Sequence, residues 1–382
     1  MSKRSEYMSR MLRAWTLALT LMATFAIFAS AAQALPAGFW GVVPQSHLDA
    51  EKVQRLSRGG VESMRLPLAW AGVQPSQESS LDWSGFDNQV EEAAKVGIKV
   101  LPFVTGAPEW AVPAKKVPGA GGLMAPARLP VGGAARTGWV NFLTAAVARY
   151  GPTGSFWAEH PGVPKRPIRN WQIWNEPNFK YFIAKPNPGE YGKLVKLSYT
   201  ALRAADPGAQ VILAGLFARP KGARNAKTGK HKSLNWYASD FVNAMYALTP
   251  GVKTRFNGVA LHPYTIRASE LTPVTEEFRK VLTTHGDGAK GLWMTELGWS
   301  SGRPSGGNQF AKGPAGQARE LRAAFTTLRG KQVKWKVKSV FWFSVDDAPG
   351  ACNFCDGSGL FGDGFVPKKS WFEYVKFAGG TP

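Results

Sequence analysis

The chain has 382 residues, 44% of them hydrophobic, and a formal net charge of +21. This length suits one large barrel or two ordinary domains, and the hydrophobic content is that of a globular protein. The charge favours anionic surroundings such as cell-wall polymers or acidic polysaccharides, but no motif for specific nucleic-acid binding accompanies it. A specific nucleic-acid partner is therefore not expected, and a solvated basic surface without any partner is the simplest alternative.

The first 34 residues have the three parts of a secretory signal peptide. Four Lys or Arg residues precede an apolar run over 14–28, and Ala32-Gln33-Ala34 provides a small-residue cleavage site. The apolar run is shorter than the roughly 20 residues that span a bilayer, so an uncleaved signal anchor is the less favoured alternative. Removing four bases and one acid lowers the net charge from +21 to +18. We expect a signal peptide over 1–34, one catalytic domain over 35–382, secretion, and no membrane span after cleavage.

Strand and helix patterns alternate along the rest of the chain. Short apolar runs predict strands over 38–43, 61–67, 98–104, 169–176, 210–215, 256–262, 291–295 and 337–344. Apolar residues at helical spacing predict helices over 48–56, 82–95, 137–150, 191–205, 236–248, 275–283 and 317–328, with a last helix beginning near Trp371. The Pro- and Gly-rich connection 105–134 shows no clear element, and its length indicates a functional loop.

This alternation predicts the α/β class and a single-domain (β/α)8 barrel, the TIM-barrel fold. A doubly wound open sheet is the main rival. Such a sheet usually has a glycine-rich turn directly after its first strand, and Val43-Pro44-Gln45 is not one.

Two glutamates stand where predicted strands end. Glu176 follows Asn175 and precedes Pro177, which cannot donate a hydrogen bond to a sheet; Glu296 lies in Thr295-Glu296-Leu297-Gly298-Trp299. Because the strands of a barrel end on one face, polar and aromatic residues at these ends are expected to meet there. The candidates are Arg65, Asn175, Glu176, His262, Tyr264, Glu296, Trp299 and Trp342.

Two carboxylates among aromatic side chains favour cleavage of a glycosidic bond. One protonated carboxyl donates a proton to the leaving oxygen, and the other attacks the sugar or activates water. If Arg65 stands beside an ionised Glu296, we expect it to lower the pKa of Glu296, and the charge of Glu296 to raise the pKa of Glu176. A retaining mechanism predicts carboxyl groups about 5 to 5.5 Å apart.

The motifs Trp174-Asn175-Glu176-Pro177 and Thr295-Glu296-Leu297-Gly298-Trp299 resemble the fourth- and seventh-strand motifs of the retaining (β/α)8 glycoside hydrolases of clan A. The resemblance covers essentially the whole chain after residue 34. It is nearest to families 5 and 39, the latter holding β-xylosidases and relatives that act on bacterial exopolysaccharides. It implies that Glu176 is the general acid/base, that Glu296 is the nucleophile, and that Asn175 binds the 2-hydroxyl of the substrate.

The resemblance also implies roles for other strand-end residues. His262 and Tyr264 match the sixth-strand His-x-Tyr, in which the tyrosine hydroxyl lies against the nucleophile. Arg65 matches the second-strand arginine that keeps the nucleophile ionised, and Trp342 matches the floor of the cleaved sugar's subsite; Trp299 is a further candidate wall. Family 5 often has a histidine at the end of the third strand, and Val104-Thr105 has none. This departure argues against a strict assignment to family 5, and it leaves family 39 or an unnamed relative of these families as the match.

Two further features carry expectations of their own. Cys352 and Cys355 form a C-x-x-C motif. In an exported protein this motif is expected to form a disulfide and not a redox pair, and a zinc site would need two more ligands. The loop 219–232 holds six Lys or Arg and no acid. It predicts a preference for an acidic or cell-envelope polysaccharide, with a merely solvated loop as the alternative.

Together these patterns predict a secreted, monomeric, retaining O-glycosyl hydrolase that acts on a β-linked oligo- or polysaccharide by double displacement. We expect no metal and no organic cofactor. We do expect the protein to associate with the cell wall. Two alternatives come from other classes: a carbohydrate-binding barrel of the cell envelope that has lost catalysis, and a basic structural protein attached to the envelope.

Overall fold

Parallel strands of buried residues form the centre of the fold. In the computed structural model, which describes residues 34–304, 308–350 and 355–382, eight strands close into a barrel in the order β1-β10-β9-β8-β7-β6-β3-β2. Their bounds are β1 (Trp40–Val43), β2 (Ser63–Ala69), β3 (Lys99–Thr105), β6 (Asn170–Asn175), β7 (Gln210–Phe217), β8 (Gly258–His262), β9 (Gly291–Leu297) and β10 (Val337–Phe343). Residues 36–382 form one compact unit. The predicted α/β class and (β/α)8 barrel are confirmed.

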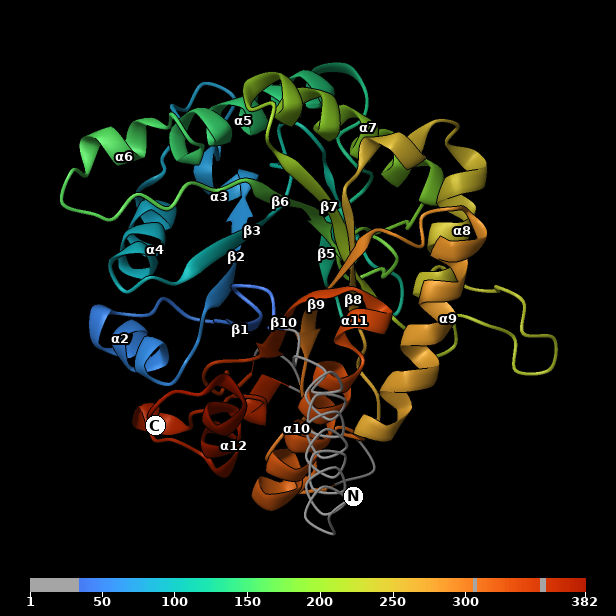
Figure 1. Cartoon of the computed structure of the whole chain (residues 1–382). Coiled ribbons are helices and arrows are strands. Elements are labelled where there is room, and N and C mark those ends of the chain that lie inside the picture. Colours follow the sequence, from blue (N-terminus) through green and yellow to red (C-terminus); the bar gives the residue numbers. More distant parts are fainter. Residues whose placement is uncertain (1–33, 305–307, 351–354) are drawn as a thin grey trace, which may run out of the picture. The chain divides into compact units, whose positions relative to one another are not determined.

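Helices surround the strands (Figure 1). They are α2 (Ala50–Arg58), α3 (Trp70–Val73), α4 (Ser84–Lys95), α5 (Gly133–Tyr150), α6 (Ser155–Glu159), α7 (Pro188–Ala205), α8 (Ala238–Leu248), α9 (Leu271–Thr284), α10 (Gly313–Gly330), α11 (Gln332–Trp335) and α12 (Lys369–Ala378). Local sequence explains where several begin. The side chain of Asn187 caps α7 by accepting from the backbone N–H of Glu190, and Pro188 occupies the first turn, where no N–H is needed.

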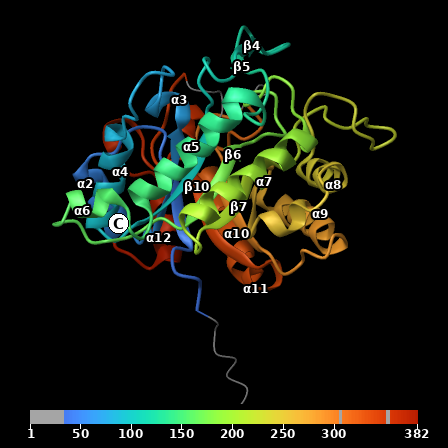
Figure 2. The same ribbon diagram turned by 90° about the horizontal axis from the view of Figure 1, so that it is seen from above.

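The long connection after β3 contains structure that the sequence did not predict. Ala114–Lys116 (β4) and Met124–Pro126 (β5) pair as a small antiparallel hairpin. Figure 2 shows this hairpin and the short helix α11 on opposite sides of the barrel. Because α11 precedes β10 while the hairpin follows β3, the hairpin lies on the face where the strands end. The prediction that 105–134 has no element of its own is wrong, because three-residue strands are too short to show a period.

Tryptophan contributes heavily to the interior. The chain contains 15 tryptophans, and at least eight are almost fully buried in the described part. Trp139, for example, lies between helices and donates its indole N–H to the Ser198 hydroxyl at 2.9 Å. A buried aromatic ring stabilises a fold mainly through the large apolar area that it removes from water. The tryptophan content is therefore explained in large part by the core.

Some expectations concern residues that the structure does not describe. The predicted signal peptide lies outside the described residues except for Ala34, and Cys352 lies outside them as well. Cys355 is buried at the start of a short 3-10 turn. The disulfide therefore stays a prediction. Among the residues described, none of the helices combines the length and apolar character needed to cross a bilayer.

Candidate active site

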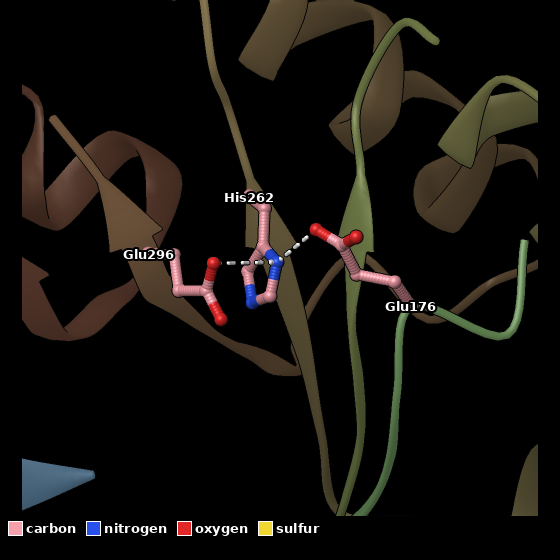
Figure 3. A group of neighbouring side chains, drawn as sticks. All are labelled: Glu176, His262 and Glu296. Carbon is pink, nitrogen blue, oxygen red and sulfur yellow. Dashed lines mark hydrogen bonds and ion pairs between the residues drawn. The ribbon is translucent and has the colours of Figure 1, made fainter. Parts of the chain in front are cut away.

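The strands bring most of the predicted site residues to one place. Arg65 lies in β2, Asn175 ends β6, His262 ends β8, and Glu296 lies in β9. Glu176 and Tyr264 come one and two residues after their strands. Figure 3 shows the side chains of Glu176 and Glu296 pointing toward His262 from opposite sides. Residues separated by up to 231 positions in the sequence thus form one cluster.

The two carboxylates are close enough to act on one sugar. An oxygen of Glu176, a ring nitrogen of His262 and an oxygen of Glu296 all lie within 4.8 Å of one another. Glu176 and Glu296 are 6% and 8% exposed, so both side chains still reach the surface. Retaining glycosidases hold their carboxyl groups about 5 to 5.5 Å apart, whereas inverting enzymes need about 6.5 to 9.5 Å to admit a water. The observed gap fits the retaining geometry.

Arg65 organises the floor of the cluster. Its Nη1 donates to Oε1 of Glu296, its Nη2 to Oδ1 of Asn175 and its Nε to Oε1 of Gln172, each at 2.6 Å. The guanidinium lies 3.9 Å from the ring centroid of Phe103, and Arg65 is 0% exposed. A buried cation is tolerated when it is paired and hydrogen-bonded on all sides. Arg65 therefore fixes Glu296 and Asn175 relative to each other, and leaves the amide NH2 of Asn175 as a donor.

Gln172 is a member of the cluster that the sequence analysis missed. Gln172 and Asn175 are three residues apart, so a regular strand would direct them to opposite faces. Both nevertheless bond Arg65. Trp174, which lies between them, has φ +72°, and Glu176, directly after Asn175, has φ +41°. Both are left-handed conformations, which are rare outside glycine. Such strain is tolerated where the surroundings fix the chain, and here it turns Asn175 and Glu176 into the site.

Two hydrogen-bond donors hold Glu296, and both favour its charged form. Oε1 accepts from Arg65, and Oε2 accepts from the Tyr264 hydroxyl at 2.8 Å. Burial nevertheless raises the pKa of Glu296, and the Arg65 charge and the Tyr264 hydrogen bond oppose that rise. The prediction of a lowered pKa is therefore wrong, because burial disfavours the carboxylate more strongly than Arg65 favours it.

Glu176 is buried too, but here a neighbouring negative charge adds to the effect of burial instead of opposing it. Burial and then the charge of Glu296 raise the pKa of Glu176 well above its ordinary value, and Arg65 opposes them from a greater distance. Glu176 accordingly keeps its proton to a higher pH than Glu296 does. This difference is the division between an acid and a nucleophile that glycosidic cleavage requires.

His262 lies between the two carboxyl groups. Its Nδ1 is 2.6 Å from Oε1 of Glu176 and 3.5 Å from Oε2 of Glu296. Burial lowers the pKa of His262 well below its ordinary value, so the ring is neutral. Among the described residues, its buried Nε2 has no hydrogen-bond partner. The ring fits because residue 215 is glycine: a Cβ there would lie 1.9 Å from Nε2.

Trp299 and Trp342, the two predicted aromatic walls, are almost fully buried. Trp342 is 0% exposed and donates its indole N–H to the carbonyl of Ser358 at 3.0 Å. Trp299 is 1% exposed and donates to the carbonyl of Thr265 at 2.9 Å. Their ring centroids are 6.2 Å apart. Both indoles are packed and hydrogen-bonded in this structure, and contact of either with a substrate stays a prediction.

The trio Glu176, His262 and Glu296 also has the spacing of metal ligands. Arg65, however, already supplies a positive charge 2.6 Å from Glu296. A divalent cation at the same carboxylate would be repelled by this buried guanidinium. The donor set therefore fits an acid/base pair better than a metal centre.

Sequence comparison identifies no relative: no protein-family model and no curated protein matches the chain. Solved structures do match in fold. A family 39 glycoside hydrolase from Bacteroides cellulosilyticus WH2 is 21% identical with a TM-score of 0.62, over 90% of this chain and 64% of that protein. A monomeric β-xylosidase from Caulobacter crescentus CB15 is 17% identical with a TM-score of 0.58, over 90% and 68%.

The intracellular xylanase TsXylA from Thermoanaerobacterium saccharolyticum JW/SL-YS485 is 14% identical with a TM-score of 0.56, over 89% of this chain and 95% of the xylanase. The chain thus spans about two thirds of the length of the family 39 hydrolase and nearly the whole of the xylanase. At these identities the similarity concerns the fold. The protein has the (β/α)8 barrel fold found in family 39 and other glycoside hydrolases.

Proposed function

We propose that the protein is a retaining glycoside hydrolase that cleaves a β-linked glycan by double displacement. The observation that carries this proposal is the pair Glu176 and Glu296, whose carboxyl oxygens lie within 4.8 Å of each other. Arg65 and Tyr264 donate to Glu296, and the pKa of Glu176 is raised well above its ordinary value. Glu176 donates its proton to the glycosidic oxygen while a carboxylate oxygen of Glu296 attacks the anomeric carbon. The carbon–oxygen bond to the leaving sugar breaks, and a glycosyl ester of Glu296 remains.

Water completes the reaction. The ionised Glu176 now removes a proton from a water molecule, whose oxygen attacks the anomeric carbon and releases Glu296 as a carboxylate. Glu176 regains its proton, so the net reaction consumes one water and yields two shorter sugars. Arg65 and Tyr264 stabilise the charge on Glu296 at the start and end of this cycle. The NH2 group of Asn175, oriented by Arg65, is a donor for a sugar hydroxyl.

A panel of 4-nitrophenyl β-glycosides of xylose, glucose and glucuronic acid, together with the matching β-linked tetrasaccharides, tests the proposal. We include xylosides because two of the proteins with this fold are a β-xylosidase and a xylanase. Hydrolysis of at least one compound by the wild type, and its loss in the Glu296→Gln protein, is the expected result. Binding across the panel without any hydrolysis would instead support a barrel that binds carbohydrate and has lost catalysis.

The pH dependence of kcat/KM should be a bell with both limbs at higher pH than isolated carboxyl groups would give. Activity falls at low pH as Glu296 takes up a proton and at high pH as Glu176 loses its own, and burial raises both pKa values. Tyr264→Phe removes a donor to Glu296, so it should move the acid limb to higher pH and leave the alkaline limb in place. An acid limb that does not move in this variant would contradict the assignment.

We further propose that the glycan is anionic. In the loop 219–232, Arg219 and Arg224 are ion-paired with Glu277, whereas Lys221, Lys227, Lys230 and Lys232 are exposed. Figure 1 shows this loop, in yellow-green, extending beyond α9. Exposed lysines attract anionic polymers at low ionic strength and are screened at high ionic strength.

The double variant Lys227→Ala with Lys230→Ala should weaken binding of polyglucuronic acid by about threefold to tenfold at low salt, since a rim charge contributes roughly 1 kcal/mol or less. The control is Lys193→Ala with Lys338→Ala, which removes two exposed lysines from α7 and β10. Equal weakening in both double variants, or equal binding of neutral and anionic glycans at low and high salt, would contradict this preference.

We also propose that residues 1–34 are a cleaved signal peptide and that the mature chain is a secreted monomer associated with the cell wall. N-terminal sequencing of the exported protein should begin at Leu35, and light scattering should give the mass of one chain. A retained N-terminus would instead support a signal anchor.

A further inference from the structure

Aromatic rings continue outward from the catalytic pair along the loop that follows Glu176. Tyr264, which bonds Glu296, contacts Phe217 edge to face with centroids 5.9 Å apart. Phe217 contacts Phe179 in the same way at 5.2 Å, and Phe179 lies 4.7 Å from Tyr181 with 33° between the rings. We call Phe217, Phe179 and Tyr181 the aromatic strip. It connects the nucleophile's hydrogen-bond partner to the protein surface.

The outer end of the strip is exposed to solvent. Tyr264, Phe217 and Phe179 are half-buried, and Tyr181 is 43% exposed. An exposed aromatic ring offers a flat apolar face that a ligand can cover. Sugar rings present flat apolar faces of C–H groups, and such faces cover aromatic side chains. The strip therefore has the chemistry of a sugar-binding surface that is continuous with the candidate active site.

The loop that carries the strip is held firmly. Asn178 is 0% exposed, and its Nδ2 donates to the carbonyls of Phe217 and Trp236, each at 2.8 Å. Its Oδ1 accepts from the backbone N–H of Phe217 at 3.2 Å. Asn178 thus ties the residues directly after Glu176 to the end of β7. A surface that is already ordered pays little entropy when a ligand stacks on it.

The position of the strip indicates which end of the substrate it would hold. In the proposed reaction Glu176 protonates the leaving oxygen, so the leaving sugars lie on the side of Glu176. Phe179 and Tyr181 follow Glu176 by three and five residues, and the backbone N–H of Phe179 donates to the carbonyl of Glu176 at 2.8 Å. The loop therefore extends from the proton donor itself.

We propose that the aromatic strip binds the sugars beyond the cleaved bond, on the leaving-group side, and that the protein cuts within a β-linked chain. This inference rests on the proposed function and specifies its substrate as an oligomer or polymer. Phe179 lies nearer the cleaved bond, and Tyr181 lies under a sugar further along the chain. A substrate with a small leaving group would not reach Tyr181.

Tyr181→Ala tests the strip on two substrates that share the same sugar, the 4-nitrophenyl β-glycoside and the β-linked tetrasaccharide. We expect kcat/KM on the tetrasaccharide to fall about threefold to tenfold more than kcat/KM on the aryl glycoside, in line with the usual contribution of aromatic stacking. Phe372→Ala is the matched control, because Phe372 is 44% exposed on α12, and it should leave both values unchanged. Equal losses on both substrates would overturn the inference.

A binding experiment separates failure of the strip from failure of the catalytic proposal. Calorimetry with the tetrasaccharide and the Glu176→Gln protein, with and without Tyr181→Ala, measures the strip without turnover. A Kd that rises about threefold to tenfold supports sugar binding by the strip, independently of whether the protein hydrolyses the glycan. An unchanged Kd overturns it, whereas a wild type that hydrolyses none of the glycans overturns the proposed function.

Discussion

The Glu296→Ala protein is expected to lose about 10⁴-fold or more of the kcat/KM on an aryl β-glycoside, because the atom that forms the covalent bond is gone. The substitution also removes the charged partner of Arg65, which is 0% exposed and 2.6 Å away. Breaking a buried ion pair from one side costs about 3 to 5 kcal/mol of stability. Thermal unfolding should therefore be measured beside the kinetics.

Glu296→Gln keeps the volume of the side chain and an oxygen that can accept from Arg65. It therefore serves as the second variant if the Glu296→Ala protein folds poorly. It should be as inactive as the alanine variant. Azide offers a positive control in Glu296→Ala: the anion can attack the anomeric carbon of a 2,4-dinitrophenyl β-glycoside from the vacated side and give the α-glycosyl azide. Near wild-type hydrolysis by either variant would remove Glu296 from the nucleophile role.

The Glu176→Gln protein is expected to show losses that depend on the leaving group. With alkyl or sugar leaving groups, which need a proton, kcat/KM should fall about 10² to 10⁴-fold. With 2,4-dinitrophenolate, which leaves without a proton, the first step should proceed nearly as in the wild type. The second step still lacks its base, so a burst of dinitrophenolate should precede slow turnover.

The same variant should lose the alkaline limb of the pH profile, because the group whose pKa is raised well above its ordinary value is no longer titratable. The wild type with the same three leaving groups is the control. Losses of equal size for all leaving groups, with the alkaline limb intact, would show that Glu176 does not deliver the proton.

The strands of the barrel were predictable because buried parallel strands are continuous apolar runs between polar loops. The run over 210–215, for example, is observed as Gln210–Phe217. The β4–β5 hairpin was not predictable, since Ala114–Lys116 and Met124–Pro126 are short, mixed in character and embedded among glycines and prolines. The hairpin is also held by a distant segment, because the backbone N–H of Ala184 donates to the carbonyl of Pro126 at 3.0 Å.

The candidate site was predictable where residue type and strand end coincide, as at Glu176 and Glu296. Gln172 was not, because it stands inside a strand and not at its end, and the sequence does not show that its side chain and Arg65 meet. The signal was indirect: a buried arginine needs acceptors beyond one carboxylate. The raised pKa of Glu296 was also missed, because burial cannot be read from the sequence with the accuracy needed to compare it with the opposing Arg65 charge.

Proton NMR of the first product formed tests the central claim most directly, namely that Glu176 and Glu296 act on one sugar from opposite sides of a gap too small for an intervening water. With a β-glycoside from the panel, the account predicts that the β-anomer of the released sugar appears first and that the α-anomer grows in later by mutarotation. Initial release of the α-anomer would show single displacement and contradict the account.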